Sequence, residues 1–191
     1  MRRLAVFASG NGTNFEAIVA ACEQKVLDAE VVLMVCDKPN AYVVERAKAH
    51  GTPSFIFSPK SYASKADFEH EIIQKLNEAG VELVCLAGYM RLIGDTLLEA
   101  YEGRIINIHP SLLPAFKGAH AIEDAFNYGV KVFGVTIHYV NAALDGGKII
   151  AQRAFEYHGN DVEELESMVH ATEYPLYIDT IQKLITSDSD K

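Results

Sequence analysis

Short apolar runs alternate with amphipathic stretches along the first part of the chain, and this pattern predicts strands alternating with helices. The expected strands cover residues 4–8, 31–36, 54–57 and 81–87 and a further run that begins at Ile105. The helices expected between them cover roughly 13–25, 41–50, 64–79 and 95–101. Strands and helices in this order are typical of an α/β fold with a mostly parallel twisted sheet and helices on both of its faces.

The pattern changes in the last third of the chain. A helix is expected over roughly 120–128, and residues 133–140 and 149–155 alternate in the manner of strands. The turn-forming sequence Asp145-Gly146-Gly147 lies between these two strands, so they are expected to pair as an antiparallel hairpin. Asp161 is expected to cap a last helix that ends near Ile185. We therefore predict one domain over residues 1–186 and a polar tail over 187–191.

The predicted topology brings three polar segments to one edge of the sheet. With right-handed crossovers and a reversal after the third strand, the first strand lies beside the fourth, and the Ile105 strand lies next to the fourth. This is a Rossmann-like arrangement. The carboxyl ends of those three strands carry the sequences SGNGTN, GYMR and NIHPS. Because ligands bind at such a switch point, we expect a functional site there.

The segment NIHPS, residues 107–111, places two hydrogen-bonding side chains at the end of a buried strand. Side chains alternate along a strand, so Asn107 and His109 are expected to point to the same side. Pro110 disfavours helical geometry at His109 and removes a backbone donor. The segment is consistent with a catalytic amide and imidazole. It is also consistent with a capped strand end in which both side chains bind loop backbone groups.

The sequence SGNGTN, residues 9–14, joins the first strand to the first helix. A small-residue turn before a helix presents free backbone N–H groups and the positive end of the helix dipole to an anion. The sequence lacks the Gly-Lys-Ser/Thr of a P-loop, and Phe15 stands where a dinucleotide fingerprint from Gly10 needs its last glycine. A lone phosphate is therefore the expected ligand, although a plain tight turn remains possible.

Composition and charge argue against a nucleic-acid-binding, secreted or membrane-spanning protein. The net charge of −9 argues against nonspecific nucleic-acid binding, which requires a basic face. Cys22, Cys36 and Cys85 lie in apolar segments without metal-ligand spacing, so we expect buried free thiols in a reducing compartment. The first residues are too short an apolar run for a signal peptide, and no run reaches membrane-spanning length. We expect a cytoplasmic protein that does not bind a membrane.

Over nearly its whole length the chain resembles the glycinamide ribonucleotide transformylases of purine synthesis, which belong to the folate-dependent formyltransferases. The resemblance rests on five segments in matching order and spacing: SGNGTNFEAI, LAGYMRLI, IINIHPSLLPAFKGAHA, VTIHYV and LDGGKII. It implies a formyltransferase fold and transfer of a formyl group from 10-formyltetrahydrofolate to the amine of glycinamide ribonucleotide. The folate serves as a co-substrate, no metal is implied, and the partners are small molecules.

The resemblance also implies roles for individual residues. The family's catalytic residues correspond to Asn107, His109 and Asp145, with Asp145 stabilising the imidazolium and relaying the amine proton through water. The ribonucleotide is expected at Gly12, Thr13, Asn14 and Glu173. The formyl folate is expected at Lys65, Met90, Arg91, Leu92, Ile93 and Asn107. We expect His138 to be a structural histidine, and we expect the loop containing Lys117 and Gly118 to be mobile until substrate binds.

Two residue assignments and several alternative functions remain open. In the family, a Tyr-Pro pair usually follows the acid that corresponds to Glu173 after a few residues, but here this pair is displaced to Tyr174-Pro175. Lys65 could equally be a solvated cation without a role in binding. A formyltetrahydrofolate deformylase would use water as acceptor and carry an additional amino-terminal domain. A methionyl-tRNA formyltransferase would carry a nucleic-acid-binding domain. A noncatalytic phosphate- or folate-binding protein would not need the three catalytic residues. The chain could be a monomer or a homodimer.

Overall fold

The computed structural model describes residues 1–187, which form two compact units that meet within one strand, after Ile106. The first unit contains the elements β1 (Arg2–Phe7), α1 (Thr13–Glu23), β2 (Ala29–Cys36), α2 (Val43–Ala49), β3 (Ser54–Ile56), α3 (Lys65–Glu78), β4 (Leu83–Leu86) and α4 (Asp95–Ala100). A single 3-10 turn, Pro59–Ser61, precedes α3. Strand β5 (Ile105–His109) begins in the first unit and ends in the second.

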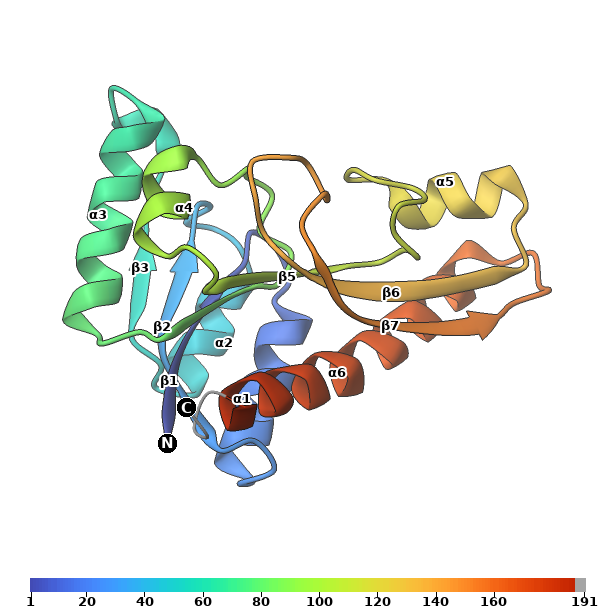
Figure 1. The fold of residues 1–191 in the computed structure, drawn as a ribbon, viewed down its shortest axis with the longest axis horizontal. Coiled ribbons are helices and arrows are strands. Elements are labelled where there is room, and N and C mark those ends of the chain that lie inside the picture. Colours follow the sequence, from blue (N-terminus) through green and yellow to red (C-terminus); the bar gives the residue numbers. More distant parts are fainter. Residues whose placement is uncertain (188–191) are drawn as a thin grey trace. The chain divides into compact units, whose positions relative to one another are not determined.

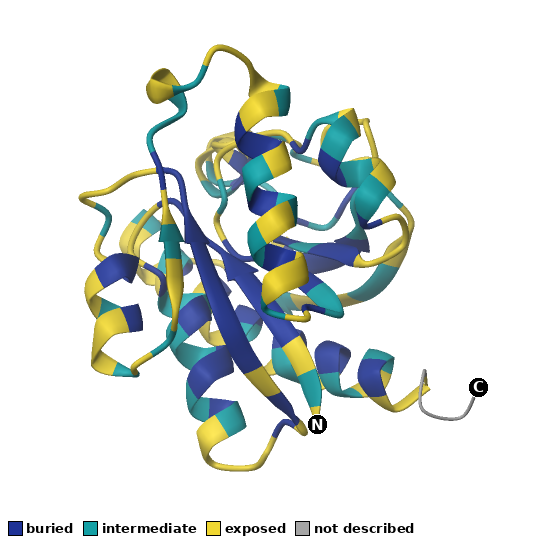
Figure 2. Ribbon diagram, turned by 90° about the vertical axis from the view of Figure 1, so that its left-hand side faces the viewer, coloured by how far each residue is buried: buried dark blue, intermediate teal, exposed yellow. Residues whose placement is uncertain are grey.

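The sheet of the first unit has the predicted doubly wound topology. Its strand order is β3-β2-β1-β4-β5, and β1 pairs in parallel with both β2 and β4. Helices α1 and α2 lie on one side of these strands, and α3 and α4 lie on the other (Figure 1). Strand β1 is buried from Leu4 onward, and β2 from Val31 onward, as the dark central strands in Figure 2 show. Both were predicted as apolar runs, and both flank the loops considered below.

The second unit begins with the last residues of β5 and continues with α5 (Ala121–Tyr128), β6 (Val132–Tyr139), β7 (Ile149–Glu156) and α6 (Val162–Ser187). The strand order is β5-β6-β7, and β6 and β7 pair antiparallel, as predicted for the hairpin. Helix α6 packs against both strands of that hairpin. Asp161 caps α6 as expected, because its Oδ1 atom accepts from the backbone N–H of Glu163 at 2.9 Å.

The predicted element boundaries differ from the structure in a few places. The fourth strand starts at Leu83 instead of Val81, because the Val81 N–H donates to Leu76 O and closes the carboxyl end of α3. Cys36 and Cys85 are buried free thiols, but Cys22 is only half-buried, which corrects that expectation. Of the predicted polar tail, Ser187 ends α6 and residues 188–191 lie outside the described residues.

Candidate active site

Asn107 and His109 lie at the carboxyl end of β5, at the start of the second unit. Their two-residue spacing in an extended strand places both side chains on one side of it. His109 is buried, with 5% of its surface exposed, and Asn107 is half-buried. The strand therefore ends in two polar groups that require partners, since an unsatisfied buried polar atom costs roughly 1–3 kcal/mol.

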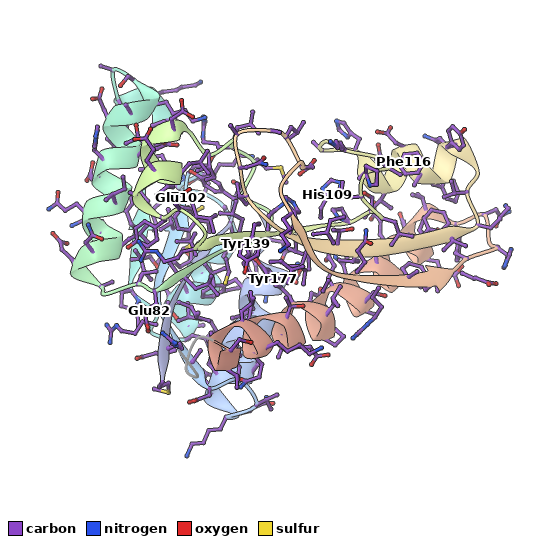
Figure 3. The ribbon with its side chains drawn as sticks, in the orientation of Figure 1. Glu82, Glu102, His109, Phe116, Tyr139 and Tyr177 are labelled. Carbon is purple, nitrogen blue, oxygen red and sulfur yellow. The ribbon has the colours of Figure 1, made fainter. Side chains whose placement is uncertain are left out.

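His109 is held on both edges of its ring. Its Nε2 atom lies 2.8 Å from the carbonyl oxygen of Phe116, in the loop that follows β5 (Figure 3). A carbonyl only accepts, so Nε2 carries the hydrogen in this arrangement. On the other edge, Nδ1 faces the Oδ2 atom of Asp145 at 3.6 Å, which is an ion-pair distance and too long for a hydrogen bond.

Asp145 belongs to the segment between β6 and β7, and its placement requires an unusual backbone. Its φ angle is 47°, in the left-handed region that Asp and Asn tolerate better than most residues. The same Oδ2 atom accepts a hydrogen bond of 2.8 Å from the backbone N–H of Gly118. Phe116 is also left-handed, with φ 52°. Strained backbone of this kind concentrates at functional sites.

Asn107 has a partner that the sequence did not indicate. Its Nδ2 atom lies 3.1 Å from Nε2 of His138 on β6, and His138 Nδ1 lies 2.9 Å from the carbonyl oxygen of Tyr139. This network assigns the hydrogen to Nδ1, so that Nε2 accepts from the amide. Burial lowers the pKa of His138, which keeps the ring neutral and able to accept. Both ring nitrogens of His138 thus have a hydrogen-bond partner, and one of these partners is the Asn107 amide.

A buried polar cluster fixes the loop that follows His109. The Thr136 hydroxyl donates to the carbonyl oxygen of Ser111 at 2.7 Å and accepts from the Leu113 N–H at 3.1 Å. Gln152 on β7 donates both to Thr136 Oγ1 and to the Leu113 carbonyl oxygen. Ser111 in turn donates to the Ala115 carbonyl oxygen at 2.6 Å. The hairpin β6–β7 therefore sets the path of the chain up to the carbonyl group that binds His109.

The SGNGTN segment lies in the first unit, between β1 and α1. Gly12 precedes α1 with φ 77°, and a Cβ atom there would lie 2.6 Å from Val43 Cβ. Glycine is thus required by backbone conformation and by packing on α2, whether or not a phosphate binds. Thr13 and Asn14 open α1, where the first N–H groups have no partner within the helix.

Arg46 on α2 holds the middle of that segment. Its Nε atom donates to the Asn11 carbonyl oxygen at 2.8 Å, and its Nη2 atom donates to Asn11 Oδ1 at 2.7 Å. Its Nη1 atom lies 3.3 Å from a carboxylate oxygen of Glu16 in the first turn of α1. The two-point contact with Asn11 uses the planar fork of the guanidinium.

The segment 90–93, which follows β4, presents apolar side chains. Met90 and Leu92 are 62% and 57% exposed, whereas Ile93 is buried. Arg91 binds Asp37 through Nε at 2.8 Å and places its guanidinium over the Phe68 ring. Two apolar side chains of this segment are therefore open to contact with a ligand.

Lys65 and Glu173 have contrasting surroundings. Lys65 is the first residue of α3 and is exposed. Glu173 is buried on α6, and its Oε2 atom lies 2.8 Å from Nδ1 of His170. That hydrogen bond raises the pKa of His170. Helix α6 continues through Pro175, so the displaced Tyr-Pro does not end it.

Within residues 1–187, no group of three or more His, Cys, Asp or Glu side chains is arranged to hold a metal ion. No helix in that range is long and apolar enough to cross a membrane.

Comparison with known proteins adds independent findings. The model of the formyl transferase family matches residues 2–181. The chain is 56% identical over 97% of its length to a curated phosphoribosylglycinamide formyltransferase of Bacillus subtilis, of which it covers 95%.

Two solved structures match closely. The first is glycinamide ribonucleotide transformylase 1 from Geobacillus kaustophilus, with 54% identity, a TM-score of 0.94, and coverage of 96% of this chain and 98% of that one. The second is phosphoribosylglycinamide formyltransferase from Bacillus halodurans, with 53% identity, a TM-score of 0.93, and coverage of 96% and 95%.

Proposed function

The chain belongs to the formyl transferase family, and from that premise we propose that it transfers the formyl group of 10-formyltetrahydrofolate to the amine of glycinamide ribonucleotide in de novo purine biosynthesis. The observation that carries the proposal is the contact of His109 with Asp145, beside Asn107 at the end of the same strand. This combination of imidazole, carboxylate and amide agrees with the activity named for the relatives that match nearly the whole chain.

Asn107 and His109 supply the electrostatic part of the proposed mechanism. The substrate amine attacks the formyl carbon, and negative charge develops on the formyl oxygen. Hydrogen-bond donors that are fixed in advance near that oxygen lower the barrier. Asn107 uses one hydrogen of Nδ2 for His138 and keeps the second for this role. The bond between the formyl carbon and N10 of the folate then breaks, so no enzyme nucleophile is needed.

His109 must change partners to take part. Its Nε2 atom is engaged by the Phe116 carbonyl oxygen, so that N–H reaches the formyl oxygen only after the loop or the ring moves. The loop is also tied to Asp145 through the Gly118 N–H. We propose that substrate binding shifts residues 116–118, which frees the imidazole and rearranges its contact with Asp145 in one movement. The sequence likewise led to the expectation that the loop containing Lys117 and Gly118 is mobile until substrate binds.

Asp145 has two tasks in this scheme. Its carboxylate stabilises the imidazolium form of His109, because an anion near a cation is favourable in a poorly solvated site. It also accepts the proton that the attacking amine loses, through a water molecule, and this proton passes to N10 of the leaving folate. In the structure the carboxylate already lies 3.6 Å from Nδ1 of His109.

Binding of the two substrates is proposed to use different loops of the first unit. Residues Gly12, Thr13 and Asn14 present helix N–H groups to the phosphate of the ribonucleotide. Residues 90–93 hold the pterin, and Lys65, as an exposed cation, attracts the acidic tail of the folate. In the second unit, Glu173 is proposed to contact the substrate amine or ribose.

The decisive experiment mixes the protein with 10-formyltetrahydrofolate and glycinamide ribonucleotide and then omits each component in turn. Tetrahydrofolate and formylated ribonucleotide should appear together, in equal amounts, only in the complete mixture. Release of formate at a similar rate without the ribonucleotide would instead identify a deformylase. Tight binding of either compound without turnover would identify a noncatalytic binding protein.

We further propose that the protein works in the cytoplasm on small molecules, without binding nucleic acid or a membrane, as a monomer or homodimer. The net charge of −9 supports the proposal that nucleic acids and membranes are not bound, since nucleic acids and anionic lipid surfaces attract basic proteins. Sedimentation equilibrium over a wide range of protein concentration distinguishes the two oligomeric states.

A further inference from the structure

Asp37 is a buried carboxylate that directly follows β2, with 2% of its side chain exposed. A buried charge is costly unless hydrogen bonds and an opposite charge compensate it. Both oxygens of Asp37 have such partners. The Ser9 hydroxyl donates to Oδ1 at 2.5 Å, and the Arg91 Nε atom donates to Oδ2 at 2.8 Å. The two partners come from different loops.

Ser9 connects those loops directly as well. It is the first residue of the SGNGTN segment, and its backbone N–H donates to the Gly88 carbonyl oxygen at 3.0 Å. Its hydroxyl oxygen accepts from the backbone N–H of Met90 at 2.9 Å. Because the hydroxyl donates to Asp37 and accepts from Met90, a continuous hydrogen-bonded path runs from Met90 through Ser9 to Asp37 and on to Arg91.

The strands explain why these groups meet. Strands β2, β1 and β4 are adjacent in that order and parallel, so the residues that follow them lie at one edge of the sheet (Figure 1). Ser9 follows β1, Asp37 follows β2, and Met90 and Arg91 follow β4. The ribonucleotide loop (residues 9–14) and the folate loop (residues 88–93) are therefore linked within one unit.

We propose that Asp37 is a positioning residue that couples the ribonucleotide loop to the folate loop, so that binding of one substrate strengthens binding of the other. The proposal rests on the proposed function, which assigns a substrate to each loop. Its physical basis is that neither loop can shift without breaking a charge-assisted hydrogen bond to the Asp37 carboxylate, whose side chain is 2% exposed. A ligand that orders one loop therefore also orders the other, and the second ligand loses less entropy on binding.

The coupling is measurable as a ratio of dissociation constants. The dissociation constant of 5-deazatetrahydrofolate, a folate that carries no transferable formyl group, is determined with and without saturating glycinamide ribonucleotide. The wild-type protein should show at least about fivefold tighter folate binding with ribonucleotide present, the lower end of typical couplings. The Ser9→Ala and Asp37→Asn variants should reduce that factor to about twofold or less.

Two further variants separate coupling from a general loss of structure. Ser9→Thr restores a hydroxyl and should recover most of the coupling. Glu82→Gln removes a carboxylate that binds Arg2 beside the opposite ends of β1 and β4, and it should leave the coupling unchanged. Coupling of wild-type size in Ser9→Ala, or no coupling in the wild-type protein, would overturn the proposal. Ser9→Ala decides the matter even if Asp37→Asn does not fold.

A measurement without substrates keeps this proposal distinct from the proposed function. The Met90 amide should exchange its hydrogen at least about tenfold faster in Ser9→Ala than in the wild-type protein, because its acceptor is gone. In Glu82→Gln it should exchange at the wild-type rate. If exchange accelerates but the wild-type protein does not transfer formyl groups, the link exists and the assignment of substrates is wrong. Unchanged exchange would exclude the link itself.

Discussion

The Nδ1 atom of His109 lies 3.6 Å from Oδ2 of Asp145, and this same oxygen accepts a 2.8 Å hydrogen bond from the Gly118 N–H. One carboxylate oxygen therefore faces the imidazole and also holds the loop whose Phe116 carbonyl engages the other ring nitrogen. The loop and the proposed catalytic pair are thus directly linked, and a change in the position of either should alter the position of the other.

We expect His109 and Asp145 to behave as one energetic unit in turnover. Asp145→Asn removes the charge but preserves the side-chain size, and Asn, like Asp, tolerates a φ near 47°. Loss of such a preorganised charge should lower kcat by about two to three orders of magnitude. The double variant with His109→Asn should cost little more than the worse single change. The double-mutant cycle is measured on kcat, with circular dichroism to check folding; fully additive losses would separate the two residues.

His138 should affect turnover through Asn107 without touching substrate. His138→Phe preserves a ring but leaves Asn107 Nδ2 and the Tyr139 carbonyl oxygen without this partner. We expect kcat to fall roughly tenfold to a hundredfold, as for other small misplacements of a reacting group. His138→Gln places an acceptor near the position of Nε2 and should recover part of the loss. Equal activity of His138→Phe and the wild-type protein would show that Asn107 is oriented by other contacts.

The fold was predictable because the sequence pattern is regular. Short apolar runs indicate strands, and each of the five expected in the first part of the chain forms a strand, with ends within two residues of those predicted. Asp161 and the Asp145-Gly146-Gly147 turn also gave correct signals for the last helix and the hairpin. These features depend on local chemistry, which a sequence displays directly.

The contacts of the site were less predictable, because they join residues distant in sequence. Nothing near Asn107 indicates that His138 is its partner, and nothing near Ser9 indicates that Asp37 binds it. The engagement of His109 by the Phe116 carbonyl depends on a left-handed φ at a residue that rarely adopts one. One feature of the sequence could have indicated that β6 contributes polar groups to the site. Thr136 and His138 are two residues apart, which places both side chains on the same side of their strand.

Glu69 should stabilise the folate loop by capping α4, the helix that follows this loop. This buried carboxylate on α3 accepts from the N–H groups of Gly94 and Leu97 at 2.6 and 3.2 Å and thus caps α4. Glu69→Ala should destabilise the protein by roughly 1–3 kcal/mol, the cost of leaving buried donors unsatisfied. It should also raise the KM for folate, because α4 begins two residues after Ile93. Urea unfolding and kinetics test this, with the exposed Glu78→Gln as a nearly neutral control.

Arg46 should affect the KM for the ribonucleotide but not the KM for folate. Arg46→Lys keeps the charge but cannot make the two-point contact with Asn11. We expect the KM for glycinamide ribonucleotide to rise roughly tenfold, which corresponds to one lost charge-assisted hydrogen bond, while the KM for folate changes little. A parallel rise in both constants would mean that Arg46 supports the whole first unit and has no particular effect on its phosphate loop.

His50 gives a prediction about pH, because its two ring nitrogens each lie 2.8 Å from a carboxylate, one of Glu16 and one of Glu23. These hydrogen bonds raise the pKa of His50 above its ordinary value of 6.5 and, together with Arg46, lower the pKa of Glu16. A histidine with a raised pKa contributes stability that is complete below its ordinary pKa and is lost as pH rises through the raised value. The contribution of Glu16 is complete above 4.5 and is lost only as the pH falls through its lowered value.

Both contributions are therefore present together between about pH 5 and 6.5. The difference in unfolding free energy between the wild-type protein and His50→Gln should be about 0.5–1 kcal/mol there, a value reduced by the partial exposure of both glutamates. It should be smaller at about pH 9, because the stabilising proton of His50 is lost as the pH rises through the raised pKa. Because burial lowers the pKa of His138, that residue destabilises the fold as pH falls, but it does so equally in both proteins and cancels in the difference. Urea unfolding at both pH values, with the exposed His158→Gln as control, tests the sign; a difference that grows with pH would contradict it.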